Sequence, residues 1–113
     1  MTITVGKHNG IWKASPPHPK VKCGTDVTWS FGPCKKWTLS LPRNVFEGDL
    51  ERQGEGPDTV SAKVKNAVPN NPEPPPPKHN PREYRYKGTV KEHDNDKGSD
   101  IEGDSPPTVI IDP

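Results

Sequence analysis

Large apolar residues are scarce in this sequence, since hydrophobic residues make up only 27% of its 113 positions. No apolar run approaches the ~18 residues that a membrane-spanning helix needs. Residues 1–15 also lack the apolar centre of a secretory signal. These absences predict a soluble protein that has no membrane partner and lies in the cytoplasm, or outside it if a signal peptide has been removed.

A large net charge of either sign is missing as well. The chain carries 16 basic and 15 acidic side chains, for a net charge of +1. Compositional disorder combines low hydrophobicity with high net charge, so the balance favours a folded domain with a small core. A nucleic-acid partner requires a clustered basic surface, and the balance argues against one. The single aromatic-basic interleaving, Tyr84-Arg85-Tyr86-Lys87, predicts a strand with its tyrosines in the core and its cations in solvent.

No apolar period of 3.6 residues extends over a useful length, and residues 44–53 are expected to form one helical turn at most. A period of two is present instead. In residues 25–31, Val27, Trp29 and Phe31 fall on one face of a strand, and the polar residues fall on the other. The same reading predicts about seven short strands, at 2–5, 11–13, 25–31, 37–41, 60–64, 84–90 and 108–111. We therefore expect a single all-β domain over residues 1–113, folded as a small antiparallel Greek-key β-sandwich.

Two long connections stand out from the strands. Residues 66–83 are proline-rich and contain Pro74, Pro75, Pro76 and Pro77, a sequence typical of a stiff polyproline II spacer. It is interpreted as a loop that crosses between the sheets, and the alternative is a ligand for an SH3- or WW-type groove. Residues 93–107 are acidic and glycine-containing, which predicts a flexible loop.

Cysteine is rare, with Cys23 and Cys34 flanking the strand at 25–31. In an oxidising compartment the two could form a disulfide worth roughly 3 kcal/mol. In the cytosol they would more often stay reduced. A zinc site that adds His8 or His18 lacks the paired Cys-x2-Cys spacing typical of zinc-binding sequences.

Acidic residues between positions 94 and 104 are candidates for binding calcium, but they do not have the EF-hand spacing. His93, Asp94 and Asp96 are therefore only weak candidates as metal ligands, and no cofactor is predicted. His93 and Asp94 are also the one adjacent histidine-acid pair, yet no nucleophile motif accompanies them. We do not expect an enzyme.

Three segments in order resemble the cupredoxin family: Gly24-Thr25-Asp26-Val27-Thr28-Trp29, then Tyr84-Arg85-Tyr86, then Thr108-Val109-Ile110-Ile111-Asp112. The resemblance implies a cupredoxin-like sandwich, and an immunoglobulin-like one is the alternative. It also implies a copper-binding cysteine two residues beyond Tyr86, where this sequence has Gly88. Met1 is the only methionine, so the His2Cys set with an axial methionine is incomplete. The resemblance therefore implies the frame without its copper centre.

The sequence thus predicts a non-catalytic module that binds another protein or serves as a structural accessory. Candidate contact residues are Pro74–Pro77 and, where they are exposed, Trp12 and Trp37, because tryptophan is frequent at interface hot spots. The alternative for both tryptophans is burial in the core. Edge strands would also allow the chain to self-associate. The alternative from another class is a metal-binding or redox protein that uses His93, the two cysteines or the acidic loop.

Overall fold

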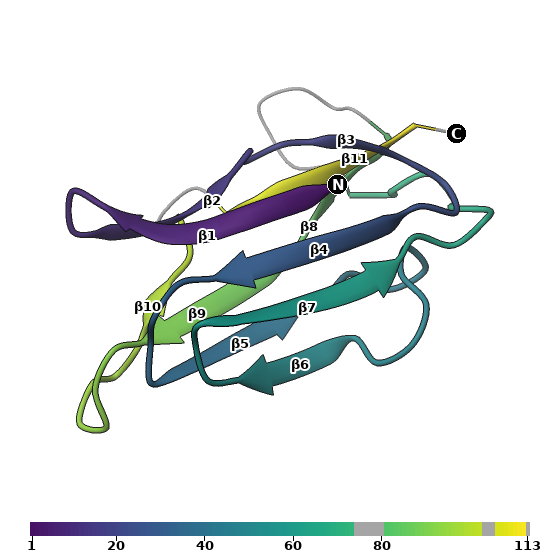
Figure 1. Ribbon diagram of the computed structural model, residues 1–113. Helices are drawn as coiled ribbons and strands as arrows, with labels where there is room; N and C mark the ends of the chain where they lie inside the picture. The colour runs from purple at the N-terminus through teal and green to yellow at the C-terminus, as the bar shows by residue number, and fades with distance from the viewer. Residues whose placement is uncertain (74–80, 103–105, 113) are drawn as a thin grey trace.

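The structure, a computed structural model, describes residues 1–73, 81–102 and 106–112. These ranges contain strands, turns and irregular segments but no helix, so the predicted all-β fold is confirmed. Accordingly, no helix with the length and apolarity of a membrane span occurs in the described ranges. The strands in Figure 1 are β1 (Thr2–His8), β2 (Ile11–Ser15), β3 (Lys20–Lys22), β4 (Asp26–Phe31), β5 (Lys36–Ser40), β6 (Glu51–Gly54), β7 (Asp58–Lys63), β8 (Glu83–Arg85), β9 (Lys87–Lys91), β10 (Ser99–Asp100) and β11 (Thr108–Asp112).

The strands form a small sandwich. One sheet has the order β2-β1-β4-β7, a second has the order β10-β9-β5-β6, and a third has the order β3-β11-β8. Only Tyr86 separates β8 from β9, so the third sheet continues the second at this residue. The pairings β1–β4 and β3–β11 are parallel, which corrects the expectation of a purely antiparallel arrangement. The β1–β4 pair is parallel because β2 and β3 carry the chain back before β4 begins.

The described ranges contain eleven strands instead of the seven that the sequence predicts, and the difference has physical causes. The segment 84–90 is split at Tyr86, because β8 pairs with β11 whereas β9 pairs with β5 and β10. Strand β6 consists of Glu-Arg-Gln-Gly and has no apolar alternation to reveal it. Strand β3 holds a single buried residue, and β10 is two residues long. Turns, bends and the start of β6 occupy 44–53 without any helix, within the expected limit of one helical turn.

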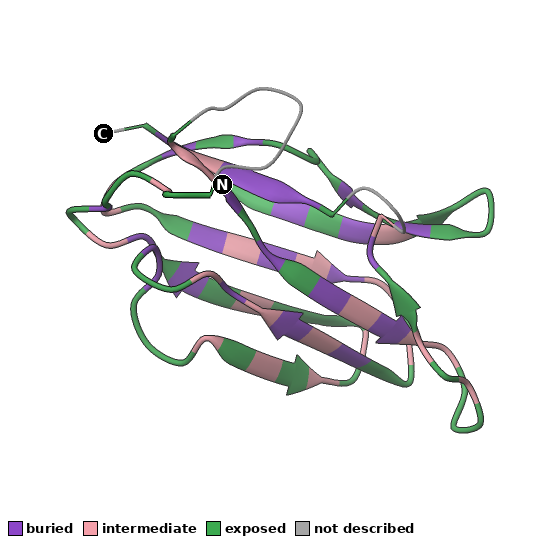
Figure 2. Ribbon diagram, turned by 180° about the vertical axis from the view of Figure 1, so that it is seen from behind, coloured by how far each residue is buried: buried purple, intermediate pink, exposed green. Residues whose placement is uncertain are grey.

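The core lies between the sheets around Trp29 of β4. This side chain is fully buried and meets the rings of Phe46 and Tyr86 edge to face, at centroid distances of 5.7 and 5.4 Å. Val27 and Phe31 point to the same side and are also buried. Buried residues alternate with partly buried or exposed residues along the strands (Figure 2). The period of two in the sequence therefore determines which residues form the core.

Candidate functional site

The tryptophans that the sequence offers for partner contact belong to the core. Trp12 is 5% exposed and Trp37 is 2% exposed, and Trp29 is fully buried. Their burial weakens the suggested role of Trp12 and Trp37 in partner binding, because each lies at an inward position of its strand. The other candidates, Pro74–Pro77, lie outside the described residues.

Cys23 and Cys34 are free thiols at opposite ends of β4. A six-residue strand spans about 20 Å, whereas a disulfide needs α-carbons within about 7 Å. Backbone hydrogen bonds fix each end: Cys23 N–H donates to the Asp112 carbonyl at 3.2 Å, and the Cys34 carbonyl accepts from Gly56 at 3.1 Å. The structure therefore keeps the two thiols reduced, which is the second of the two alternatives that the sequence left open.

His93, Asp94 and Asp96 lie in the turn between β9 and β10. The Asp96 N–H donates to the His93 carbonyl at 3.0 Å within this turn. The Asp96 carboxylate accepts hydrogen bonds from the backbone N–H groups of Glu92 and Gly98, both at 3.2 Å. These bonds favour the ionised form and lower the pKa of Asp96. Asp94 lies 3.7 Å from the Lys35 ammonium group. Within the described ranges, no three side chains of the metal-ligand types come together.

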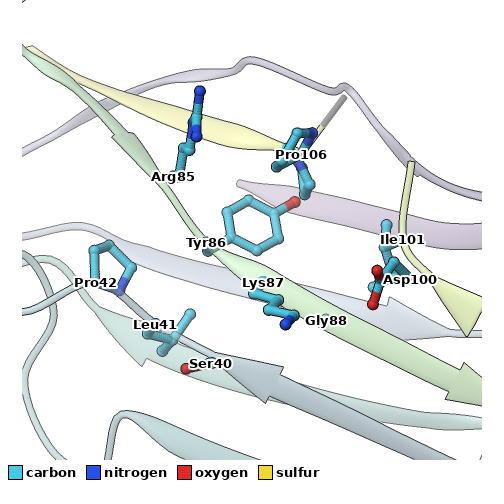
Figure 3. A pocket seen from close by; sticks show the side chains of 11 residues that line it. Ser40, Leu41, Pro42, Arg85, Tyr86, Lys87, Gly88, Asp100, Ile101 and Pro106 are labelled. Carbon is cyan, nitrogen blue, oxygen red and sulfur yellow. The ribbon is translucent and has the colours of Figure 1, made fainter. Parts of the chain in front are cut away.

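Two cavities lie beside the junction of β8 and β9, and Pro42 and Arg85 line both of them. The first has a volume of about 480 Å³, and Figure 3 shows Tyr86 in its lining, between Pro106 on one side and Leu41 and Pro42 on the other. The second has a volume of about 570 Å³ and extends to the segment 69–73. Both volumes are in the range of ligand-binding pockets. We call the two cavities together the Arg85 groove.

Three exposed cations line the Arg85 groove: Arg85 in both cavities, Lys87 in the first and Arg43 in the second. None of them forms an ion pair or a side-chain hydrogen bond with any described residue. Asp100 lines only the first cavity and Glu73 only the second. The part that the two cavities share, lined by Pro42 and Arg85, is therefore cationic. The one acidic residue of each cavity lies outside this shared part.

Leu41, Tyr86 and Ile101 form a buried apolar wall of the first cavity. The Tyr86 hydroxyl has no hydrogen-bond partner among the described residues. Burial raises the pKa of Tyr86 to about 12. The nearby indole N–H of Trp29 lowers the pKa of Tyr86 and offsets part of this rise, whereas the negative charge of Glu102 raises the pKa further.

A second polar group lies at the start of β11, where Thr108 is 3% exposed. Its hydroxyl donates to the Glu83 carboxylate at 2.6 Å, so that its oxygen accepts from Nδ1 of His18 at 2.8 Å. This chain joins the proline-containing segment before β3 to β11 and β8. Sequence reasoning missed it, because its three members are far apart in the chain and no local pattern links them.

The sequence does predict one part of the Arg85 groove. Tyr84 and Tyr86 are buried while Arg85 and Lys87 are exposed, so the expected alternation is confirmed. The approach of Pro42 and Arg43 to Arg85 is not readable from the sequence, because it depends on where β5 ends beside β8 and β9.

The sequence matches no protein-family model, and no curated protein shows significant similarity to it.

Proposed function

We propose that this protein is a non-catalytic binding module that contacts another protein through the Arg85 groove. The observation that carries this proposal is that two cavities, of about 480 and 570 Å³, meet at an exposed arginine without a described partner. Arginine is enriched at protein interfaces, and it is one of the residues that most often dominate their energy.

The composition of the groove supports the same function. Pro42 and Pro106 line the first cavity and are partly or fully exposed, so they provide apolar surface, while Arg85 and Lys87 lie at its exposed margin. An apolar centre with a polar rim is the usual composition of a protein interface. The groove thus takes the role that the sequence suggested for Trp12 and Trp37.

We further propose that the frame is cupredoxin-like and has no copper site. The segments that carry the resemblance form β4, β8 with Tyr86, and β11. At Gly88, where the family has its copper-binding cysteine, a β-carbon would overlap Cδ1 of Ile101 and lie 3.2 Å from the Thr38 carbonyl oxygen. The side chain of Ile101 thus occupies the space in which a thiolate would have to lie.

The test is affinity purification from the protein's own cells with three baits: the wild type, Arg85→Glu and Lys63→Glu. Lys63 is an exposed lysine on β7, outside both cavities, so its variant is the matched control for the charge change. A partner enriched by the wild type is then purified, and its affinity for each variant is measured by calorimetry.

We expect Arg85→Glu to weaken binding of the purified partner by about tenfold or more, equivalent to 1.4 kcal/mol or more. Lys63→Glu should leave the affinity within about twofold. Equal affinity for all three proteins, or no partner that binds after purification, would overturn the proposal.

A further inference from the structure

The register of β8 leaves the backbone of Arg85 facing away from β11. Tyr86 N–H donates to the Pro107 carbonyl at 3.2 Å, and Ile111 N–H donates to the Arg82 carbonyl at 2.8 Å. The even-numbered residues of this segment therefore bond toward β11. Because backbone groups of successive residues point to opposite edges of a strand, those of Glu83 and Arg85 point the other way.

The neighbours of Arg85 along this edge already have partners. The Glu83 carbonyl accepts a hydrogen bond of 2.8 Å from the side-chain amide of Asn71. On the other side of Arg85, Lys87 pairs with Ser40 at the end of β5. Between these two points, the described residues provide no backbone partner for Arg85.

Pro42 explains why the pairing stops. Extending the register Ser40–Lys87 by two residues places Pro42 opposite Arg85. A proline has no N–H group to donate to the Arg85 carbonyl, so the ladder cannot continue. The gap in the ladder coincides with the part of the groove that both cavities share, since Pro42 and Arg85 line both.

The charges indicate what chemistry fits this gap. Arg43, Arg85 and Lys87 surround it without described anionic partners, so it attracts carboxylates. A single-stranded nucleic acid would also bring negative charge, but it relies on exposed aromatic faces for stacking. Tyr84 and Tyr86 are only 7% and 2% exposed and do not offer such faces. A free N–H and C=O pair matches a peptide backbone.

Resting on the proposed function, we propose that the groove binds an extended acidic segment of a partner protein. One residue of that segment pairs its backbone with Arg85 in the gap that Pro42 leaves. Acidic side chains on either side of it contact Arg43, Arg85 and Lys87. The backbone pair fixes the position of the segment, and the cations select its charge.

The probe is an eight-residue capped peptide in which valine and glutamate alternate, and its comparator has lysine in place of glutamate. Binding is followed by amide chemical shifts and by fluorescence anisotropy. We expect shifts at Arg85, Lys87 and Ser40 with the acidic peptide and none with the basic one. Arg85→Glu should weaken binding by about tenfold or more, whereas Lys63→Glu should change it by less than about twofold.

Backbone pairing is tested with two further acidic peptides, N-methylated either at every valine or at every glutamate. Successive N–H groups point to opposite edges of an extended chain, so one pattern should weaken binding about tenfold and the other should not. Pro42→Val restores an N–H opposite Arg85 and should close the gap, which also weakens binding without a change in charge. Its fold is checked by circular dichroism.

The remaining outcomes separate this inference from the proposed function. If both methylated peptides bind like the parent, or if the acidic peptide does not bind, the inference is wrong. The binding-module proposal still stands in that case, provided that the purified partner is sensitive to Arg85→Glu. If an eight-nucleotide oligothymidylate binds more tightly and displaces the acidic peptide, the occupant is a nucleic acid and the inference is overturned.

Discussion

The indole of Trp37 stacks on the ring of Phe31, with centroids 4.4 Å apart and ring planes 7° from parallel. Phe31 ends β4 and Trp37 lies at the start of β5, so the pair links two sheets across a short connection. Both side chains are 2% exposed. The contact therefore couples the two layers on the side where the chain passes from one to the other.

Truncation of either ring should be costly. Trp37→Ala or Phe31→Ala should each lower the free energy of unfolding by about 3–5 kcal/mol, because a large buried side chain is lost and a cavity remains. Urea denaturation followed by fluorescence of the remaining tryptophans measures the change. A double-mutant cycle with leucine variants should give a coupling of about 0.5–1.5 kcal/mol. Strictly additive effects would show that the stacking itself contributes nothing.

Gly88 should not tolerate a side chain. Gly88→Ala should lower the free energy of unfolding by about 1–3 kcal/mol, because its β-carbon would overlap Cδ1 of Ile101. In an Ile101→Val background, where Cδ1 is absent, the same substitution should cost less. Denaturant titration of the four proteins measures the coupling. An equal cost in both backgrounds would show that Ile101 does not fill this space.

The buried phenol of Tyr86 should make the protein sensitive to alkali. Its pKa is raised from 10.0 to about 12, so the folded state holds the phenol neutral at pH values where the unfolded chain ionises. The contribution of the neutral Tyr86 phenol to the free energy of unfolding is fully present below pH 10, and it is lost as the pH rises from about 10 to about 12. Absorbance at the tyrosinate band reports the ionisation of Tyr86, and chemical denaturation at several pH values across this range measures the loss of stability.

Tyr86→Phe is the control for this pH dependence. The variant removes a hydroxyl that has no described hydrogen-bond partner, so its stability at pH 7 should be unchanged or higher by about 1 kcal/mol. The alkaline loss should be smaller than in the wild type. A marked loss of stability at pH 7 would contradict the absence of a hydrogen-bond partner for the phenol.

The hydrogen-bonded chain through Thr108 should depend on its hydroxyl. Thr108→Val keeps the shape of the side chain but leaves the partly buried Glu83 carboxylate and His18 without their shared partner. We expect a loss of about 1–3 kcal/mol in the free energy of unfolding. Thr108→Ser keeps the hydroxyl and should therefore retain most of the wild-type free energy of unfolding. If serine and valine are equivalent, the chain does not stabilise the fold.

Local alternation explains why much of the fold can be predicted from the sequence. The strands that contain Val27 or Leu39 each bury an apolar face, and their positions follow from a period of two. Strand β6 shows no such pattern, because backbone pairing with β5 holds it rather than a buried face of its own. Trp12 and Trp37 were candidates for both environments, because tryptophan fits an interface as well as a core, and the structure buries both.

The sequence by itself determined that this chain is an all-β protein, that Tyr84 and Tyr86 face inward, and that Arg85 and Lys87 face solvent. These properties depend on the spacing of residues within one strand. Only the tertiary structure decided that Pro42 lies opposite Arg85, that Arg43 joins the same groove, and that Cys23 and Cys34 stay apart. Those relationships depend on strand pairing and on the points where strands end, and pairing between distant segments leaves no periodic trace in the chain.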